Sequence, residues 1–224
     1  MNKVKLLAMT QPEKESGIPD ASGLIAYCAR VSNPDNQGNY ETAPRLIDYL
    51  IKNAHWSPLE MVNLVFEIDC PRDIARQILR HRSFSFQEFS TRYSKTQPAE
   101  IPLFRRQDYE NRQNSIDDIH PSHQEDLQAR AGRIIADAFL FYESLLECGV
   151  AKETARRILP MCTPTSMYMT GTLRSWIHYI QLRANADTQL EHRQVALACQ
   201  RIFRLNFPVI AKAVFGDETP DSSD

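Results

Sequence analysis

The stretch 60–70, EMVNLVFEIDC, places a large apolar side chain at every second position, at Val62, Leu64, Phe66 and Ile68. Mostly polar residues stand between them. Since successive side chains of a strand point to opposite faces, this pattern predicts a strand with one strongly apolar face. Pro71 follows at once and is typical of the first residue of a helix. Residues 71–82 are therefore predicted to form a short amphipathic helix.

The remaining elements are mostly helices. Apolar residues recur at helical spacing in further segments, and these are 20–32, 44–55, 127–148, 151–159, 173–185 and 188–207. Asp20 is the predicted N-cap of the first of them. Strands are predicted at 4–10 and, as a strand or an extended link, at 166–172. Because strands and helices come in segregated groups, the fold is predicted to be α+β with helix predominating.

Two segments show no periodic pattern. Residues 105–126 are polar and are predicted to form a long excursion or loop. Residues 216–224 are small and acidic, and are predicted to be a disordered tail. The whole chain, 1–224, is predicted to be a single domain.

Composition excludes several classes of protein. The net charge is −2, and the chain carries 7 glycines with no GxGxxG and no GxxxxGK[ST] motif. A general nucleic-acid binder usually carries a basic excess, and a nucleotide site here cannot use the Rossmann or P-loop glycine turn. The longest apolar runs are too short to span a membrane. The five cysteines are scattered without a CxxC pair, which predicts buried thiols in a reducing cytoplasm.

Residues 75–94, ARQILRHRSFSFQEFSTRYS, gather four arginines, one histidine and four serines. One interpretation is that Arg80, His81 and Arg82 complement the negative end of the helix before them, an effect worth about 0.3–1 kcal/mol each. The other is a site for a phosphate and a ring, since arginine forks and serine hydroxyls bind phosphate. A Ser-His nucleophile is disfavoured, because no acidic residue can be assigned to orient His81 toward Ser90.

The order Arg-His-Arg, seven residues, Ser at positions 80–90 resembles the signature of the flavin-dependent thymidylate synthases, and TRYS follows it directly. Other segments are also similar to this family, namely HWSPLE at 55–60, ARRILP to LR at 155–183, and TQLEHRQVALA at 188–198. The similarity covers nearly the whole chain and is weakest in 105–126 and in the tail.

The resemblance implies a helix-rich α+β domain with a small antiparallel sheet, of the thymidylate synthase-complementing protein type and without a Rossmann unit. It implies a cytoplasmic homotetramer with sites at the subunit interfaces, and neither a metal nor a nucleic-acid or membrane partner. The implied reaction is the reductive methylation of dUMP to dTMP, with methylenetetrahydrofolate as the carbon donor. FAD would carry the hydride, and NADPH would reduce the flavin.

Site residues carry over from the matching motifs. The implied contacts with dUMP are Gln77, Arg80, Glu88, Ser90, Arg92, Arg156 and Arg183. The implied contacts with FAD are Ser57, Arg80, His81, Arg82, Glu88, Arg174 and His178. His55 and Tyr93 would face the flavin or the folate. Arg183 is also the implied catalytic residue, since a guanidinium beside the uracil would favour ionisation of its N3–H.

Some of these positions also fit structural roles. Residues 57–60, SPLE, match a helix capping box, and a helix N-terminus capped in this way also attracts phosphate. Trp176, Tyr179 and Ile180 are spaced as core residues of a helix. Thr172 and Asp187 depart from the family pattern.

Two other functions compete with this one. A nucleotide-binding phosphohydrolase could use the same arginine and serine pocket, but it would want a metal-holding cluster, and no such spacing occurs in the sequence. A nucleic-acid-binding module could use the Arg-His-Arg patch together with the phenylalanines that follow it. The net charge of −2 argues against this function, because nucleic-acid binding depends on positive charge.

Overall fold

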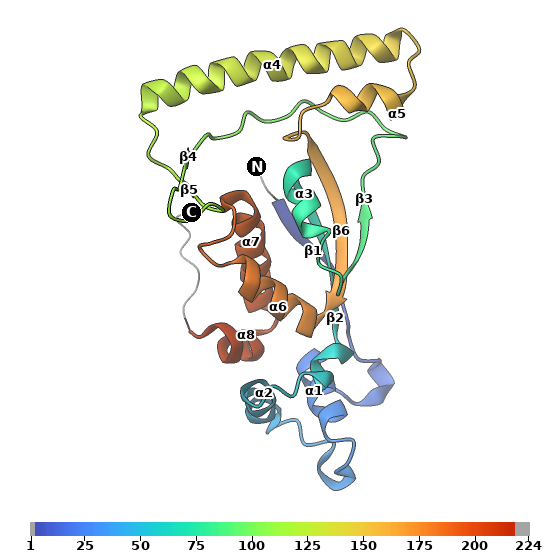
Figure 1. Cartoon of the computed structure of the whole chain (residues 1–224). Helices are drawn as coiled ribbons and strands as arrows, with labels where there is room; N and C mark the ends of the chain where they lie inside the picture. Colours follow the sequence, from blue (N-terminus) through green and yellow to red (C-terminus); the bar gives the residue numbers. More distant parts are fainter. Residues whose placement is uncertain (1–2, 218–224) are drawn as a thin grey trace.

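The computed structural model describes residues 3–217. Its centre is a four-stranded antiparallel sheet in the order β1-β2-β6-β3. These strands are β1 (Lys3–Met9), β2 (Asn63–Pro71), β3 (Ser85–Glu88) and β6 (Pro164–Thr172). In Figure 1 the sheet occupies the middle of an elongated molecule. The α+β class with a small antiparallel sheet is confirmed.

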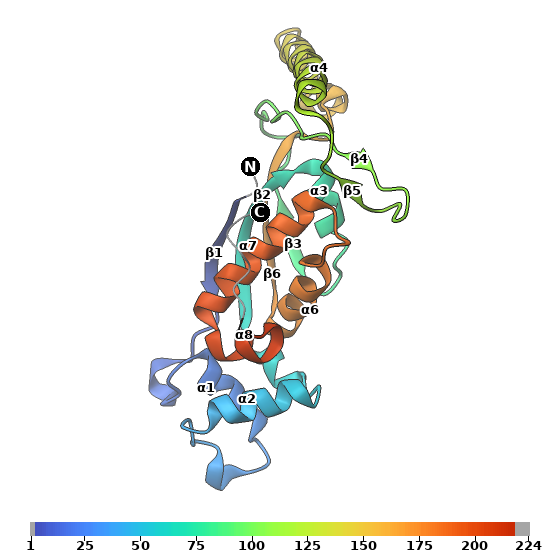
Figure 2. The same cartoon turned by 90° about the vertical axis from the view of Figure 1, so that its left-hand side faces the viewer.

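Helices cover one face of this sheet. α6 (Leu173–Arg183) follows β6 directly, and α7 (Leu190–Asn206) runs along the sheet, as Figure 2 shows. The alternation within β2 decides this arrangement, because Leu64, Phe66 and Ile68 share one face and are almost fully buried in the main core. The Phe66 ring meets Trp176 of α6 edge-on, with 4.5 Å between the ring centroids. Trp176, Tyr179 and Ile180 are all buried, as predicted.

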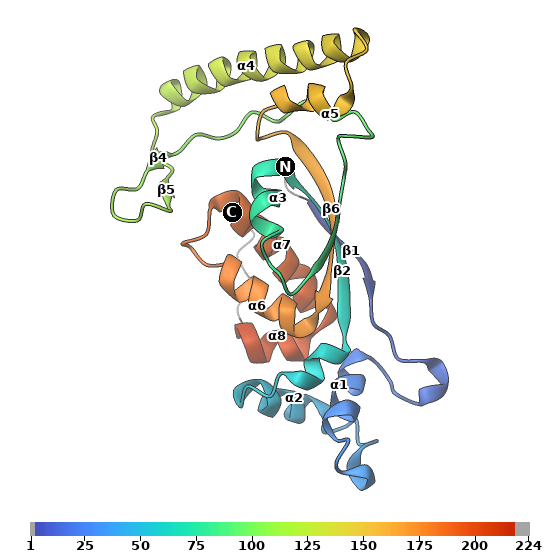
Figure 3. The same cartoon turned by 45° about the vertical axis from the view of Figure 1, so that its right-hand side comes forward.

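A smaller helical layer lies at the end of the sheet (Figure 3). It contains α1 (Ala21–Ala29), α2 (Ala43–Lys52) and the 3-10 helix η3 (Ser57–Met61), and α2 packs against α8 (Pro208–Phe215). Two short 3-10 turns, η1 (Lys14–Ser16) and η2 (Pro34–Asn36), belong to the connections. The Asp20 carboxylate accepts a hydrogen bond from the Gly23 backbone N–H at 2.7 Å, which confirms the predicted N-cap of α1.

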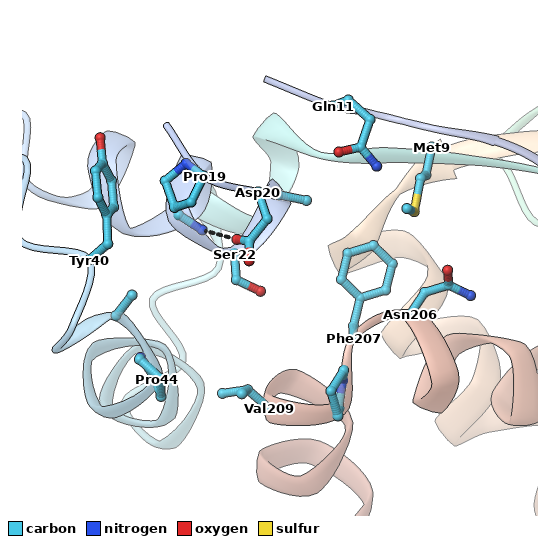
Figure 4. A pocket seen from close by; sticks show the side chains of 14 residues that line it. Met9, Gln11, Pro19, Asp20, Ser22, Tyr40, Pro44, Asn206, Phe207 and Val209 are labelled. Atoms are coloured by element: carbon cyan, nitrogen blue, oxygen red, sulfur yellow. Dashed lines mark hydrogen bonds between the residues drawn. The ribbon is translucent and has the colours of Figure 1, made fainter. Parts of the chain in front are cut away.

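Replacing Asp20 by alanine is expected to lower the free energy of unfolding by about 1 kcal/mol. The Gly23 N–H would lose the acceptor that Figure 4 shows. Urea-unfolding midpoints of the two proteins measure this loss. Asp20→Asn keeps an acceptor oxygen and should lose less than about 0.5 kcal/mol, so equal losses in both variants would contradict the cap.

The longest helix stands apart from the sheet. α4 (Pro121–Glu147) crosses one end of the molecule in Figure 1 and packs on α5 (Lys152–Ala155) and the 3-10 turn η4 (Arg156–Ile158). The contact forms a second core in which Ile135, Phe139, Tyr142 and Ala155 are buried. On the rest of its surface α4 exposes three large apolar side chains, with Ile134 at 69%, Leu140 at 64% and Phe141 at 56% exposure. This second core is much smaller than the main one.

The predicted helix at 71–82 is shorter than expected. α3 spans Arg72–Ile78, and Pro71 is still paired to Pro164 as the last residue of β2. The helix ends early because the chain turns and buries Phe84 against Trp176, with 4.8 Å between the ring centroids. Arg80, His81 and Arg82 therefore lie in the turn between α3 and β3. They follow the C-cap residue Leu79 directly, so the interpretation that they complement the negative end of this helix stays a prediction.

The excursion predicted at 105–126 is partly ordered. It contains a hairpin of β4 (Arg106–Gln107) and β5 (Ser115–Ile116), and its last residues already belong to α4. The segment 188–207 is helical as predicted, but α8 was not predicted and begins at Pro208, a residue that favours the first turn of a helix. Of the predicted disordered tail, 218–224 lies outside the described residues.

The capping box predicted at 57–60 is also wrong. Trp56 is the residue at the N-cap of η3, no side chain caps it, and Glu60 instead pairs with Arg174. The cysteines are all unpaired, but only Cys70 and Cys199 are buried, while Cys148 is exposed. Within 3–217, no helix has the length and apolar character that crossing a bilayer requires.

Candidate functional site

A groove of about 540 Å³ lies beside α6. Arg174 and His178 stand one helical turn apart and line this groove together with Trp56, Glu60 and Ser83. The Arg174 Nη1 atom donates to Glu60 Oε1 at 2.5 Å, so a carboxylate offsets part of its charge. Two of the predicted FAD contacts thus share one groove with hydroxyl and aromatic neighbours.

Arg183 and His81 meet at the C-terminal end of the same helix. The Arg183 Nε–H donates to His81 Nε2 over 3.0 Å, and the His81 ring lies edge-on to Tyr179 with 4.9 Å between centroids. Burial, aided by the charges of Arg183 and His178, lowers the pKa of His81 to about 4. His81 is therefore neutral near pH 7 and can accept this hydrogen bond. Because its partner is a neutral imidazole, this contact does not offset the charge of Arg183.

Gln77 is held by two partners from the start of α7. Its Nε2 donates to Gln189 Oε1 at 2.6 Å, and its Oε1 lies 3.1 Å from His192 Nδ1. The other ring nitrogen of His192 lies 3.2 Å from the Tyr179 hydroxyl. His192 is fully buried, and this burial, aided by Arg183 and then His81, lowers its pKa to about 3. Burial also raises the pKa of Tyr179, so both rings are uncharged at neutral pH.

Arg92 and Arg156 lie where the segment after β3 meets α5 and η4. Arg156 Nη1 donates to the buried Thr91 hydroxyl at 3.2 Å, whereas Arg92 is exposed and its Nη2 lies 3.6 Å from Glu153. The Ser90 hydroxyl accepts from the backbone N–H of Arg92 at 3.3 Å. These three predicted dUMP contacts therefore come from two neighbouring segments.

The other predicted site residues are spread along the same region. Glu88, at the end of β3, accepts from the Thr165 hydroxyl of β6 at 3.1 Å. The remaining five, Ser57, His55, Arg80, Arg82 and Tyr93, are exposed. Arg183 is held by His81, whereas Arg156 is held by Thr91, so these predicted ligands fall into two groups with different partners.

A second hollow contains none of the predicted site residues. It lies where the N-terminal ends of α1, α2 and α8 approach one another, and Met9, Asp20, Tyr40 and Phe207 are among its walls (Figure 4). The Asp20 carboxylate already caps α1 there. Across residues 3–217, no group of three or more His, Cys, Asp or Glu side chains is arranged to hold a metal ion.

His192 and Tyr179 were not assigned to the site from the sequence. Tyr179 is predicted only as a core residue, and no role is predicted for His192. A signal for His192 exists, because it falls on the buried face of α7 with Val195, Ala196 and Cys199. A titratable ring on such an apolar face needs a hydrogen-bond partner, and the partner here is Gln77.

Comparison with known proteins identifies the family. The family model described as "Thymidylate synthase complementing protein" matches residues 14–209. The chain is 48% identical to the "Probable flavin-dependent thymidylate synthase" of Paramecium bursaria Chlorella virus 1, over 94% of this chain and 97% of that protein. It belongs to the flavin-dependent thymidylate synthase family. A second member, from Synechocystis sp., is 46% identical over 94% of this chain and 98% of its own length.

A solved structure is similar to this flavin-dependent thymidylate synthase along almost its whole length. It is described as a UMP/dUMP methylase, PolB, from Streptomyces cacaoi bound with 5-Br dUMP, and it is 25% identical with a TM-score of 0.83. The match covers 98% of each chain. The phosphohydrolase alternative receives no support from any of these relatives.

Proposed function

We propose that this chain catalyses the reductive methylation of dUMP to dTMP, with methylenetetrahydrofolate as the carbon donor. Turning a methylene group into a methyl group requires a hydride, so the reaction consumes two electrons, which we assign to NADPH. FAD is the proposed carrier of this hydride, because the chemistry of hydride transfer belongs to the cofactor. The observation that carries the proposal is the Arg183 guanidinium, which a neutral histidine holds without offsetting its charge, in a chain of this family.

Arg183 is the proposed catalytic residue. A guanidinium beside the uracil stabilises the anion that forms when N3–H ionises, and its effect is large where water is excluded. The Arg183 side chain is half-buried and its orientation is fixed by His81 at 3.0 Å. Gln77, Arg80 and Glu88 are the proposed remaining contacts to the uridine part of dUMP.

The phosphate of dUMP is proposed to bind at Arg92, Arg156 and Ser90. Two fixed cations suit a phosphate dianion, and guanidinium groups can bind it in bidentate fashion. Arg156 is oriented by Thr91, while the exposed Arg92–Glu153 pair at 3.6 Å is worth little and can open for a ligand. Arg156 should therefore contribute more to dUMP affinity than Arg92.

The groove beside α6 fits one part of FAD. Arg174, His178 and the Ser83 hydroxyl supply hydrogen-bond donors for phosphate groups, and Trp56 supplies an aromatic wall. Ser57, Arg80, His81, Arg82 and Glu88 are the other proposed FAD contacts. His55 and Tyr93 are proposed for the flavin or folate side, and both are exposed. Residues from neighbouring subunits are proposed to complete each site.

The colour of the purified protein tests the proposal. A yellow protein whose flavin spectrum is bleached by NADPH, faster when dUMP is present, and which forms dTMP with methylenetetrahydrofolate, supports it. A colourless protein that takes up no added FAD, or a flavoprotein that never converts dUMP, rejects it.

A homotetramer is proposed, and α4 is the surface that supports it. It exposes three large apolar residues, Ile134, Leu140 and Phe141, and Ile134 and Phe141 lie two helical turns apart on the same side of the helix. Large exposed apolar patches mark protein–protein interfaces. We also propose a cytoplasmic location, in keeping with five unpaired cysteines.

Replacing Phe141 by aspartate is expected to break the tetramer into smaller species. Burial of a Phe side chain contributes roughly 1.5–3 kcal/mol per copy, and an aspartate buried there would add a desolvation penalty. Light scattering after size-exclusion chromatography measures the mass. Glu143→Ala, on the same helix, is the matched control and should keep the wild-type mass. An unchanged mass for Phe141→Asp would exclude α4 as the interface.

A further inference from the structure

A continuous series of hydrogen bonds links the core behind α6 to the β4–β5 hairpin. It runs from Tyr179 to His192, Gln77, Gln189, Glu191 and Arg105, at heavy-atom distances of 2.6–3.2 Å. These residues come from α6, α7, α3 and the hairpin segment, so the series ties four parts of the chain together. Gln77, the proposed dUMP contact, lies in the middle.

The donors and acceptors of this series have one consistent direction. His192 is neutral, so it has one N–H and one lone pair. Because the Glu191 carboxylate accepts from Gln189 Nε2, Gln189 Oε1 faces Gln77 Nε2, and the oxygen of Gln77 faces His192 Nδ1. The Tyr179 O–H therefore donates to His192 Nε2, and His192 Nδ1–H donates to the Gln77 carbonyl oxygen. Gln77 Nε2 then donates to Gln189, and Gln189 Nε2 to Glu191 at 3.0 Å.

This direction of the hydrogen bonds fixes the orientation of the Gln77 side-chain amide. An isolated glutamine amide can rotate by half a turn and exchange its oxygen with its nitrogen. Here a donor faces Oε1 and an acceptor faces Nε2, so the flipped amide would lose both hydrogen bonds. One N–H and one lone pair of the amide are left over for a ligand, each in a defined direction.

The hairpin holds the far end of the series. The Arg105 side chain is only 9% exposed, and its Nη2 lies 2.7 Å from Glu191 Oε1. Its Nε donates to the Ser115 hydroxyl of β5 at 2.8 Å, so the guanidinium clamps the hairpin to the start of α7. Asn111, in the loop of the hairpin, also reaches Asp187 at 3.4 Å. The segment predicted as a polar excursion is thus anchored next to Gln77.

We propose that Arg105 and His192 are positioning residues for dUMP, which act from the two ends of this series to hold the Gln77 amide in one orientation. The inference rests on the proposed function, since it assigns the Gln77 contact to dUMP. It makes the β4–β5 hairpin a part of the substrate site, although no hairpin side chain needs to touch the substrate. The effect should appear in dUMP affinity more than in turnover.

The test compares two adjacent arginines in the holoenzyme. Arg105→Ala should raise the KM and the Kd for dUMP about tenfold, the worth of one hydrogen bond to a fixed amide, and change kcat less than threefold. Arg106→Ala is the matched control, because Arg106 pairs with exposed Asp118, and its dUMP affinity should equal that of the wild type. Equal KM values for the Arg105→Ala and Arg106→Ala enzymes would overturn the proposal.

A second measurement separates positioning from a general structural defect. In a Gln77→Ala background, Arg105→Ala should have no further effect on the Kd for dUMP, because the amide that it orients is gone. A further tenfold loss in that background would overturn the proposal. If Arg105→Ala does not fold, Arg105→Lys replaces it, since lysine keeps the charge near Glu191 but cannot also reach Ser115 with a rigid fork.

The His192 end is tested by a conservative pair. His192→Asn keeps a donor near the position of Nδ1 and should retain dUMP affinity within about threefold, whereas His192→Phe should lose about tenfold. Equal losses would overturn the proposal. The wild-type enzyme distinguishes the two proposals. If the wild type neither binds FAD nor converts dUMP, the proposed function is rejected. If the wild type is active and the variants keep its dUMP affinity, only the positioning role is rejected.

Discussion

Substitution of Arg183 by alanine is expected to slow dTMP formation by about 100- to 1,000-fold, the cost of removing one preorganised group that stabilises developing negative charge. The structure shows this guanidinium half-buried and bound through Nε to a neutral imidazole at 3.0 Å. Its charge is thus not cancelled by its partner, and its direction is fixed. Steady-state rates at saturating dUMP, together with dUMP binding by calorimetry, measure the effect.

Two further variants sharpen this prediction. Arg183→Lys keeps a charge without the planar fork and should recover only part of the rate. Arg201→Ala removes an exposed arginine of α7 and should leave the rate unchanged. The charge of Arg183 also lowers the pKa of His81, so that pKa should rise in Arg183→Ala when followed by NMR. A rate within threefold of the wild type would remove Arg183 from the catalytic role.

The second large expected effect is a loss of folding stability at low pH. The pKa values of His81 and His192 are lowered to about 4 and about 3, so in the window below pH 6.5 the unfolded chain binds protons that the folded chain does not. The stability that these neutral rings contribute is present above pH 6.5 and is lost as the pH falls toward the folded pKa values. For fully buried His192 the loss is about 1.4 kcal/mol per pH unit, or roughly 2–3 kcal/mol by pH 4.5.

Urea-unfolding midpoints at pH 7.5 and pH 5 measure this loss. His192→Asn removes a titrating ring, so the difference between the two midpoints should shrink. His123→Asn replaces an exposed histidine on α4 and should leave the difference as in the wild type. If the His192→Asn and His123→Asn proteins show the same pH dependence, the buried ring is not the source of the acid sensitivity.

Local patterns of the sequence were sufficient for most of the fold. The alternation at 62–68 predicts β2 and its buried face, and Asp20 predicts the start of α1, because side-chain periodicity and capping act within a few residues. The end of α3 could not be predicted in this way. It depends on Phe84 reaching Trp176, a contact between residues far apart in the chain. This packing, and not the local helix preference, determines where α3 ends.

The resemblance supplies the predicted members of the candidate site but not the contacts between them. The motif gave Arg80 to Arg82 and Ser90 by resemblance, but the pairing of His81 with Arg183 spans 102 positions and leaves no local signal. Gln77 and His192 are 115 positions apart. Hydrogen bonds between such distant residues depend on how α3, α6 and α7 pack over the sheet, which a periodic pattern does not specify.

The small second core beneath α4 has a kinetic consequence for a dilute solution of the enzyme. Arg156 belongs to η4, which packs on α4. Its hydrogen-bond partner Thr91 lies at the same end of the molecule. In the proposed tetramer, this end has few buried residues of its own and should therefore unfold locally first when the subunits dissociate. Serial dilution should therefore raise the KM for dUMP before the yellow colour is lost, because the groove proposed for the flavin lies on α6, which packs on the larger core.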